Sequence, residues 1–205
     1  MAKFAKKVLQ YGKTDNAERS TGTKRRIRQS VLDVVGADSA RVFDAFAGAG
    51  SMYRAVWGQA SEYLGCDTRY FRDKRPAFVC DNTRVMRAID LARFNVFDLD
   101  AYGSPWQQAL ILAARRPVAP GEKIGLVITE GSGMKLKLGG MPLALAEIAG
   151  FKGKIAGAAR LQDNVLDRAI AGLTKKMACT VVKRWQAKGK TGTSMRYVGL
   201  VLSGL

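Results

Sequence analysis

The sequence predicts one α/β domain, with a mostly parallel seven-stranded sheet, helices on both faces and a C-terminal antiparallel hairpin. Short apolar runs alternate with segments of helical periodicity along most of the chain, which is typical of parallel strands connected by helices. The last two apolar runs are separated only by residues 188–192, a glycine-containing connection that favours a hairpin. Of the 205 residues, 47% are hydrophobic and 25% are charged, so the chain can bury a core.

Residues 1–20 are polar and basic without a clear period, and we expect them to form a basic N-terminal arm ahead of a single domain of residues 21–205. The domain opens with a predicted helix over 23–36, which has one apolar face and ends at Gly36. The predicted strands cover 40–44, 63–67, 77–81, 94–98, 123–129, 178–186 and 193–202. The predicted helices between them cover 52–59, 83–92, 106–116, 141–149 and 162–176.

The charge of the chain indicates a polyanionic partner. Lys and Arg number 34 against 17 Asp and Glu, which gives a net charge of +17. Such a surplus favours nucleic acid, because neutralising phosphates releases counterions. An acidic membrane surface is less favoured, since no basic amphipathic helix with an apolar face stands out.

Several classes of protein are disfavoured by what the sequence lacks. No apolar run approaches the roughly 18 residues of a spanning helix, and no secretory signal is visible, so we expect neither membrane insertion nor export. The chain has no His, which excludes Ser-His-Asp triads, Cys-His nucleophiles and the common His-containing metal sites. Its three Cys lack metal-type spacing, which predicts no metal site and a reduced, cytoplasmic protein.

Acidic residues end three consecutive predicted strands, where an open parallel sheet binds its ligands. Asp44 ends the first strand, and the small-residue loop that follows allows close approach of a ligand to the backbone, before a helix that offers its amides. Asp67 ends the second strand, where a carboxylate can accept both hydroxyls of a ribose. Asp81 and Asn82 end the third, positioned to meet an adenine amino edge. Together they predict a cofactor site.

Residues 42–51, Val-Phe-Asp-Ala-Phe-Ala-Gly-Ala-Gly-Ser, resemble the first motif of class I S-adenosylmethionine-dependent methyltransferases. They match the Asp-x-Phe-x-Gly-x-Gly form of those that methylate amino groups of nucleic acids. The resemblance covers residues 20–205 and implies a Rossmann-like class I methyltransferase fold with S-adenosylmethionine as cofactor. The implied cofactor-binding residues are Asp44, Phe46, Ala47, Gly48, Gly50, Asp67, Asp81, Asn82 and Asp98. A nicotinamide-binding domain is the competing interpretation, but it usually has Gly-x-Gly-x-x-Gly, and Tyr53 occupies the last glycine position.

Residues 98–106 join the fourth predicted strand to its helix, where a methyl acceptor must lie. The carboxylate of Asp100 and a neighbouring backbone carbonyl can accept the two hydrogens of an exocyclic amine and leave its lone pair facing the methyl group. Tyr102 can stack on a base taken out of its helix. Asp98, at the strand end, orients the loop or the cofactor, and catalysis is then mainly positioning. The plain alternative is a turn with Ser104 as a helix cap.

The same loop resembles the Asp-Leu-Asp-Pro-Tyr-Gly-Ser-Pro loop of the tRNA (guanine-N2)-dimethyltransferases at seven of eight positions, with Ala101 in place of proline. Alanine keeps the carbonyl acceptor but loosens the loop. This resemblance favours RNA, guanine-N2 and a role in tRNA processing. DNA adenine-N6 or cytosine-N4 methylation remains an alternative, as does a non-catalytic nucleic-acid-binding subunit that keeps the fold.

Ten basic residues are predicted to contact nucleic acid, although such charges are often simply solvated. They are Lys24, Arg25, Arg26, Arg69, Arg72, Lys74, Arg75, Lys183, Lys188 and Lys190. The chain has no obvious sequence-reading module, so a separate recognition subunit is a further possible partner.

Overall fold

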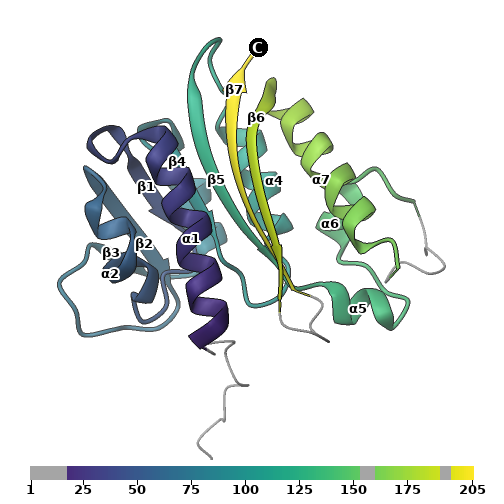
Figure 1. Cartoon of the computed structure of the whole chain (residues 1–205), viewed down its shortest axis with the longest axis horizontal. Helices are drawn as coiled ribbons and strands as arrows, with labels where there is room; N and C mark the ends of the chain where they lie inside the picture. Colours follow the sequence, from purple (N-terminus) through teal and green to yellow (C-terminus); the bar gives the residue numbers. More distant parts are fainter. Residues whose placement is uncertain (1–17, 153–159, 190–194) are drawn as a thin grey trace, which may run out of the picture.

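The computed structural model describes residues 18–152, 160–189 and 195–205. They form one seven-stranded sheet in the order β3-β2-β1-β4-β5-β7-β6 (Figure 1). Every neighbouring pair from β3 to β5 is parallel, whereas β7 is antiparallel to both β5 and β6. The strands are β1 (Arg41–Asp44), β2 (Glu62–Asp67), β3 (Ala77–Val79), β4 (Val96–Leu99), β5 (Lys123–Glu130), β6 (Cys179–Lys188) and β7 (Arg196–Gly204). The predicted fold class is confirmed.

The helices and short 3-10 turns follow the predicted order with four differences. They are α1 (Glu18–Val35), η1 (Ala37–Ser39), α2 (Ser51–Ala55), η2 (Trp57–Gln59), α3 (Asn82–Ala88), η3 (Leu91–Arg93), α4 (Trp106–Arg115), α5 (Gly133–Lys137), α6 (Leu143–Ile148) and α7 (Gln162–Lys176). The first helix begins five residues before its predicted start, and α5 was not predicted. The predicted helix over 52–59 breaks at Val56, whose backbone is not helical. The helix predicted over 83–92 ends at Ala88, and Asp90 then caps a separate turn.

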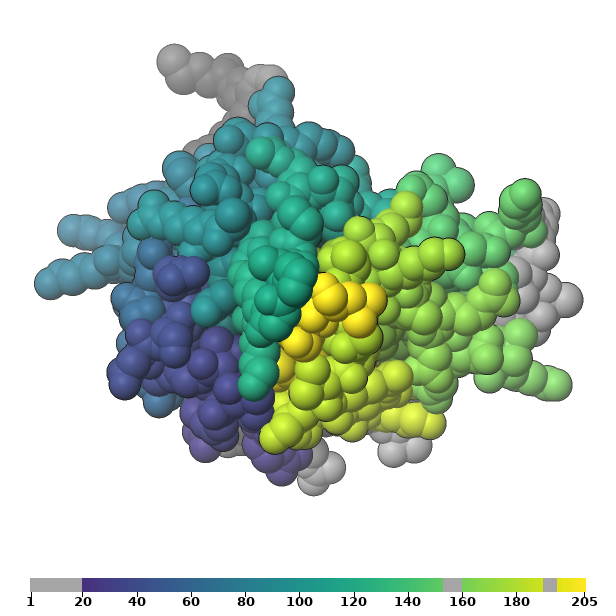
Figure 2. Space-filling model, turned by 90° about the horizontal axis from the view of Figure 1, so that it is seen from above, coloured from purple at the N-terminus to yellow at the C-terminus, as the bar shows by residue number. Residues whose placement is uncertain are grey.

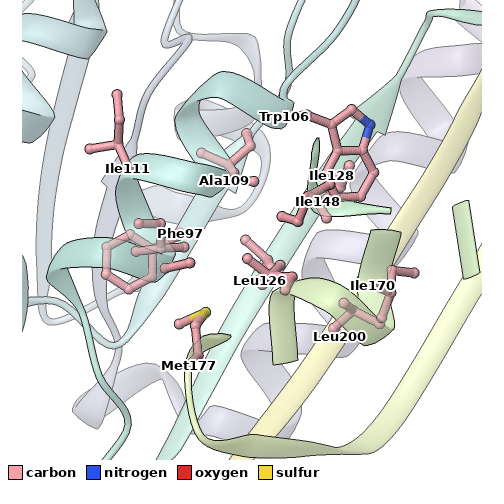
Figure 3. Close-up of a cluster of buried hydrophobic side chains, with 14 of the residues drawn as sticks. Phe97, Trp106, Ala109, Ile111, Leu126, Ile128, Ile148, Ile170, Met177 and Leu200 are labelled. Carbon is pink, nitrogen blue, oxygen red and sulfur yellow. The ribbon is translucent and has the colours of Figure 1, made fainter. Parts of the chain in front are cut away.

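The core has two layers, one on each face of the sheet. Alternating strand residues supply them: Phe43 and Phe97 face one layer, and Val42 and Val96 face the other. The larger layer lies under α4, α6 and α7 (Figure 3). The labelled side chains there are Phe97, Trp106, Ala109, Ile111, Leu126, Ile128, Ile148, Ile170, Met177 and Leu200.

Two glycines bring α1 close to the other face of the sheet. A Cβ atom on Gly125 of β5 would lie 2.5 Å from the Val31 side chain, and one on Gly199 of β7 would lie 2.8 Å from Ile27. Neither strand could carry a side chain at these positions without moving α1. This close packing brings the N-terminal half of α1 to the carboxyl ends of β1, β4 and β5 (Figure 1).

The opposite end of the molecule is closed by the turn that precedes β5. The Gly204 amide donates a hydrogen bond to the Glu122 carbonyl at 3.0 Å, and Pro120 forms a bridge with Gly204. Figure 2, viewed from this end, shows the turn beside the last residues of β7. The acidic strand ends described next lie at the other end.

Candidate functional site

The loop after β1 has a backbone that suits its glycines. Gly48 and Gly50 have φ angles of +45° and +76°, in the left-handed region that side chains rarely adopt. The Phe46 amide donates to Asp44 at 3.1 Å, and the Gly48 amide donates to Asp67 at 2.9 Å. The loop is therefore tied to the ends of both β1 and β2.

Arg75 fixes the same loop from a different segment. Its guanidinium is buried and donates to the carbonyl of Ala47 at 2.7 Å and to that of Gly48. A side chain on Gly50 would lie 3.0 Å from Arg75. Arg75 is buried and its donors are taken up by the glycine loop, so it is not open to nucleic acid, contrary to the prediction from the sequence.

The carboxylate of Asp67 lies between two loops. One oxygen accepts from the Gly48 amide, and the other accepts from the Arg69 amide at 2.9 Å. Each carboxylate oxygen has a further lone pair, and the residue is only partly buried. Asp67 can therefore still accept hydroxyl groups, as a ribose would require.

Asp81 and Asn82 begin α3 rather than end β3, which stops at Val79. Asp81 is exposed, and its Oδ1 caps the helix by accepting from the Thr83 amide at 2.9 Å. Hydrogen bonding to Thr83 lowers the pKa of Asp81. The Asn82 side chain donates to the Ala45 carbonyl at 2.7 Å and accepts from Gln108 at 2.8 Å, so it joins the β1 loop to α4. Asp81 is therefore the more accessible hydrogen-bond acceptor for an adenine amino group, because it is exposed and the Asn82 amide is already bonded on both sides.

Asp44 and Asp98 are buried at the carboxyl ends of the central strands β1 and β4. Asp44 accepts from the Tyr63 hydroxyl at 3.0 Å, and burial together with nearby Asp98 raises the pKa of Asp44 to about 8. Asp98 accepts from Nε and Nη2 of Arg28 at 2.6 and 2.8 Å and from the Trp57 ring nitrogen at 2.7 Å. Neither side chain is exposed to a ligand. Asp98 therefore joins the end of β4 to Arg28 of α1, and its burial argues against the direct cofactor contact that the sequence predicted for it.

Asp100 lies at the surface of this ion-pair network. Its Oδ2 accepts from Arg28 Nη2 at 2.9 Å, and its Oδ1 lies 2.9 Å from Lys24 Nζ. Burial opposes ionisation of Asp100, but Arg28 and Lys24 more than offset it and hold the pKa of Asp100 below its ordinary value. Asp100 is thus an anionic hydrogen-bond acceptor and a weak base.

In the loop of residues 98–106, called the reactive loop below, Tyr102 is exposed, whereas Ala101, Pro105 and Trp106 are buried. The Tyr102 side chain is 77% exposed. The Gly131 amide after β5 donates to the Gly103 carbonyl at 2.6 Å, which fixes the loop against its neighbour. Behind it, buried Glu130 accepts from the ring nitrogen of Trp106, and burial raises the pKa of Glu130. The exposed ring of Tyr102 is therefore carried on a loop that the hydrogen bond from Gly131 to Gly103 holds in place.

The remaining basic residues do not form a single group. Arg25, Arg26, Arg69, Arg72, Lys74 and Lys183 are exposed. Lys24 pairs with Asp100, and Lys188 lies 3.3 Å from Asp163. Lys190 lies outside the described residues. Exposed side chains on α1, on the segment between β2 and β3 and on β6 are therefore open to a polyanion.

Sequence reasoning missed Arg28, Trp57 and Tyr63, which hold the buried carboxylates. Arg28 lies on the face of α1 that carries Val31 and Leu32, both buried. A cation on the apolar face of a helix is a usable signal, because a buried charge requires a partner. The identity of that partner, 70 residues away, has no local signature.

Among the residues that the structure describes, no helix is long and apolar enough to cross a membrane. Over the same residues, no group of three or more His, Cys, Asp or Glu side chains is arranged to hold a metal ion.

No protein-family model matches the sequence, and no curated protein matches it either. Solved structures share its fold at low identity. Trm1 from Pyrococcus horikoshii, in complex with S-adenosyl-L-methionine, aligns with 90% of this chain at 15% identity and a TM-score of 0.57. The chain spans 56% of the Trm1 length.

Two further structures are similar over most of their own length. TYW2 from M. jannaschii, in complex with AdoMet, aligns over 94% of this chain and 80% of its own, at 9% identity and a TM-score of 0.58. The N-methyltransferase NodS from Bradyrhizobium japonicum WM9, in complex with S-adenosyl-L-homocysteine, aligns over 93% and 89%, at 12% identity and a TM-score of 0.56. These similarities confirm the Rossmann-like fold of class I methyltransferases.

Proposed function

We propose that this chain transfers a methyl group from S-adenosylmethionine to an exocyclic amino group of a nucleic-acid base, with guanine-N2 of a tRNA-like RNA favoured. The observation that carries the proposal is the position of the loop containing Asp100 and Tyr102. It lies at the carboxyl end of β4, whose neighbour β1 carries the glycine loop, and it matches an amine-methylating signature at seven of eight positions.

The glycine loop and Asp67 fit the proposed cofactor. Gly48 and Gly50 hold the loop in a left-handed backbone that side chains rarely adopt, and Asp67 has lone pairs for the ribose hydroxyls. Asp81 would meet the adenine. The fold neighbours solved with S-adenosylmethionine or its demethylated product support this assignment. When bound, the cofactor would supply an electrophilic methyl group: the bond from the methyl carbon to sulfur would break as the amine nitrogen takes the methyl group, S-adenosylhomocysteine would be left, and the nitrogen would release one proton to water.

In this proposal the protein mainly positions the amine. Asp100 accepts one amine hydrogen at Oδ1, where the amine replaces Lys24, while Arg28 keeps hold of Oδ2. The second hydrogen would go to the neighbouring backbone carbonyl of Ala101, which accepts from the Gly103 amide at 3.0 Å and keeps a further lone pair. Tyr102 stacks on the extruded base. Since the nitrogen lone pair attacks directly, the low basicity of Asp100 is suited to orientation rather than proton abstraction.

The experiment is incubation of the protein with methyl-labelled S-adenosylmethionine and separate pools of tRNA, rRNA and DNA. We expect label in the tRNA pool. Label confined to DNA would support the adenine-N6 or cytosine-N4 alternative. Calorimetry with S-adenosylmethionine alone tests the alternative of a non-catalytic nucleic-acid-binding subunit. Such a subunit would keep the fold without binding the cofactor and would release no heat. Transfer that requires an added protein would identify the proposed recognition subunit.

A further inference from the structure

Residues 68–76, which connect β2 to β3, combine exposed positive charge with an exposed aromatic ring. We call them the 68–76 segment. Arg69, Arg72 and Lys74 are exposed, and Tyr70 is 74% exposed. Phe71 lies near the guanidinium groups of Arg69 and Arg75, at 5.5 and 5.8 Å from its ring centre. Tyr70, in contrast, presents most of its ring to solvent.

The segment is anchored at both ends to the glycine loop. At its start, Asp67 accepts from the Arg69 amide with one oxygen and from the Gly48 amide with the other. At its end, Arg75 donates to the carbonyls of Ala47 and Gly48 and pairs with Asp73 at 2.9 Å. The exposed side chains are therefore carried on a support that is fixed to the proposed cofactor site.

We propose that the 68–76 segment is a docking element for single-stranded nucleic acid, with Tyr70 stacking on a base and Arg69, Arg72 and Lys74 contacting the flanking phosphates. This inference rests on the proposed function. Proteins bind unpaired strands with positive side chains along the nucleic-acid backbone and with aromatic rings on which the bases stack. The net charge of +17 favours a polyanion, and the anchors keep the strand next to the glycine loop.

Stacking at Tyr70 is distinct from the role proposed for Tyr102. Tyr102 follows β4 and would hold the base that reacts, whereas Tyr70 follows β2 and would hold a neighbouring nucleotide. A substrate engaged at both places must have its bases unpaired, so a loop or an end of an RNA fits better than a continuous duplex.

The test is fluorescence anisotropy with a labelled single-stranded RNA oligonucleotide and a DNA of the same sequence, at matched salt. Tyr70→Ala should weaken RNA binding about 5- to 150-fold, the factor for one lost stacking contact, and Tyr70→Phe should bind normally. The double variant Arg72→Ala with Lys74→Ala should weaken binding and flatten its salt dependence. The matched control is Lys175→Ala with Lys176→Ala, which removes the same charge from exposed positions at the far end of α7. That control should bind almost as tightly as the wild type.

Calorimetry with S-adenosylhomocysteine should give unchanged affinity for Tyr70→Ala, which shows that the glycine loop is intact. Full RNA affinity in Tyr70→Ala, or equal losses in the two double variants, would overturn the docking element. So would Tyr70-dependent binding to phosphatidylserine vesicles without binding to oligonucleotides. Failure of the proposed function is separate: a wild type that binds RNA through Tyr70 but transfers no methyl group would refute methylation and leave the docking element standing.

Discussion

Asp67 connects the two loops that would surround a cofactor, because its carboxylate holds the amides of Gly48 and Arg69. We expect Asp67→Ala to weaken binding of S-adenosylmethionine by about 1.5–3 kcal/mol, the range for hydrogen bonds to a charged group. Isothermal titration calorimetry measures this directly. Undiminished affinity would refute the ribose assignment.

Asp100 tests the chemistry of the reactive loop. Asp100→Ala should still fold, because Arg28 keeps its two hydrogen bonds to Asp98. Its turnover should fall on the order of 100-fold or more, as for loss of one preorganised polar contact, with cofactor affinity almost unchanged. Full activity at saturating cofactor and RNA would show that Asp100 is only structural.

Tyr102 tests recognition of the base. Tyr102→Ala should weaken RNA binding by about 1–3 kcal/mol, and Tyr102→Phe should be mild because the stacking face survives. Binding titrations of both variants give the answer. If the phenylalanine variant loses as much as the alanine variant, the hydroxyl rather than the ring makes the contact.

The positions of Asp67, Asp100 and Tyr102 could be predicted, because residues at or just after the end of a parallel strand lie at the carboxyl ends of the strands, where such sheets bind their ligands. The burial of Arg75 could not be predicted. It stands in a run of charges that looks solvated, and only the carbonyls of Ala47 and Gly48 explain why it turns inward.

At the scale of elements, α1 holds the reactive loop through Arg28, which is buried and contacts both Asp98 and Asp100. Arg28→Met would leave buried Asp98 without its cation and Asp100 with Lys24 alone. We expect it to lower the free energy of unfolding by about 3–5 kcal/mol.

The control for Arg28 is Arg26→Met on the exposed face of the same helix, which should change stability by less than about 0.5 kcal/mol. Urea unfolding of the three proteins measures both values. Equal stability of the two variants would mean that the network does not hold α1 to β4.

All seven strands could be predicted, most of them as short apolar runs bounded by polar residues or glycine, and the mostly exposed β6 from its hairpin connection to β7. The start of α1 was set too late, since its first turn has no apolar periodicity. The 133–137 helix was missed because Gly131 and Gly133 suggest an open loop. The pairing of α1 with β4 depends on contacts across 70 residues, which local patterns do not encode.

At the scale of the whole molecule, the chain has no His, the side chain that ordinarily titrates between about pH 5 and pH 8. A change of stability in this range therefore reports on groups whose pKa is shifted. Burial raises the pKa of Asp44 from 3.8 to about 8, so the folded state binds a proton that the unfolded state has lost. The free energy of unfolding should therefore fall as pH rises through this range.

Asp44→Asn should make that decline shallower, because asparagine carries no ionisable proton. Urea unfolding at several pH values compares the two proteins. Identical slopes would show that Asp44 does not supply the dependence, and buried Glu130, whose pKa is also raised, would be the next residue to replace.

The most direct test of the whole proposal is the position of the transferred methyl group. RNA labelled by the protein from S-adenosylmethionine is digested to nucleosides, which are separated and identified by mass spectrometry. The proposal predicts methyl groups on an exocyclic amine, with N2-methylated guanosine as the main product and a yield lower by on the order of 100-fold from Asp100→Ala under the same conditions. Methyl groups on a ring carbon, a ring nitrogen or a ribose oxygen would contradict it.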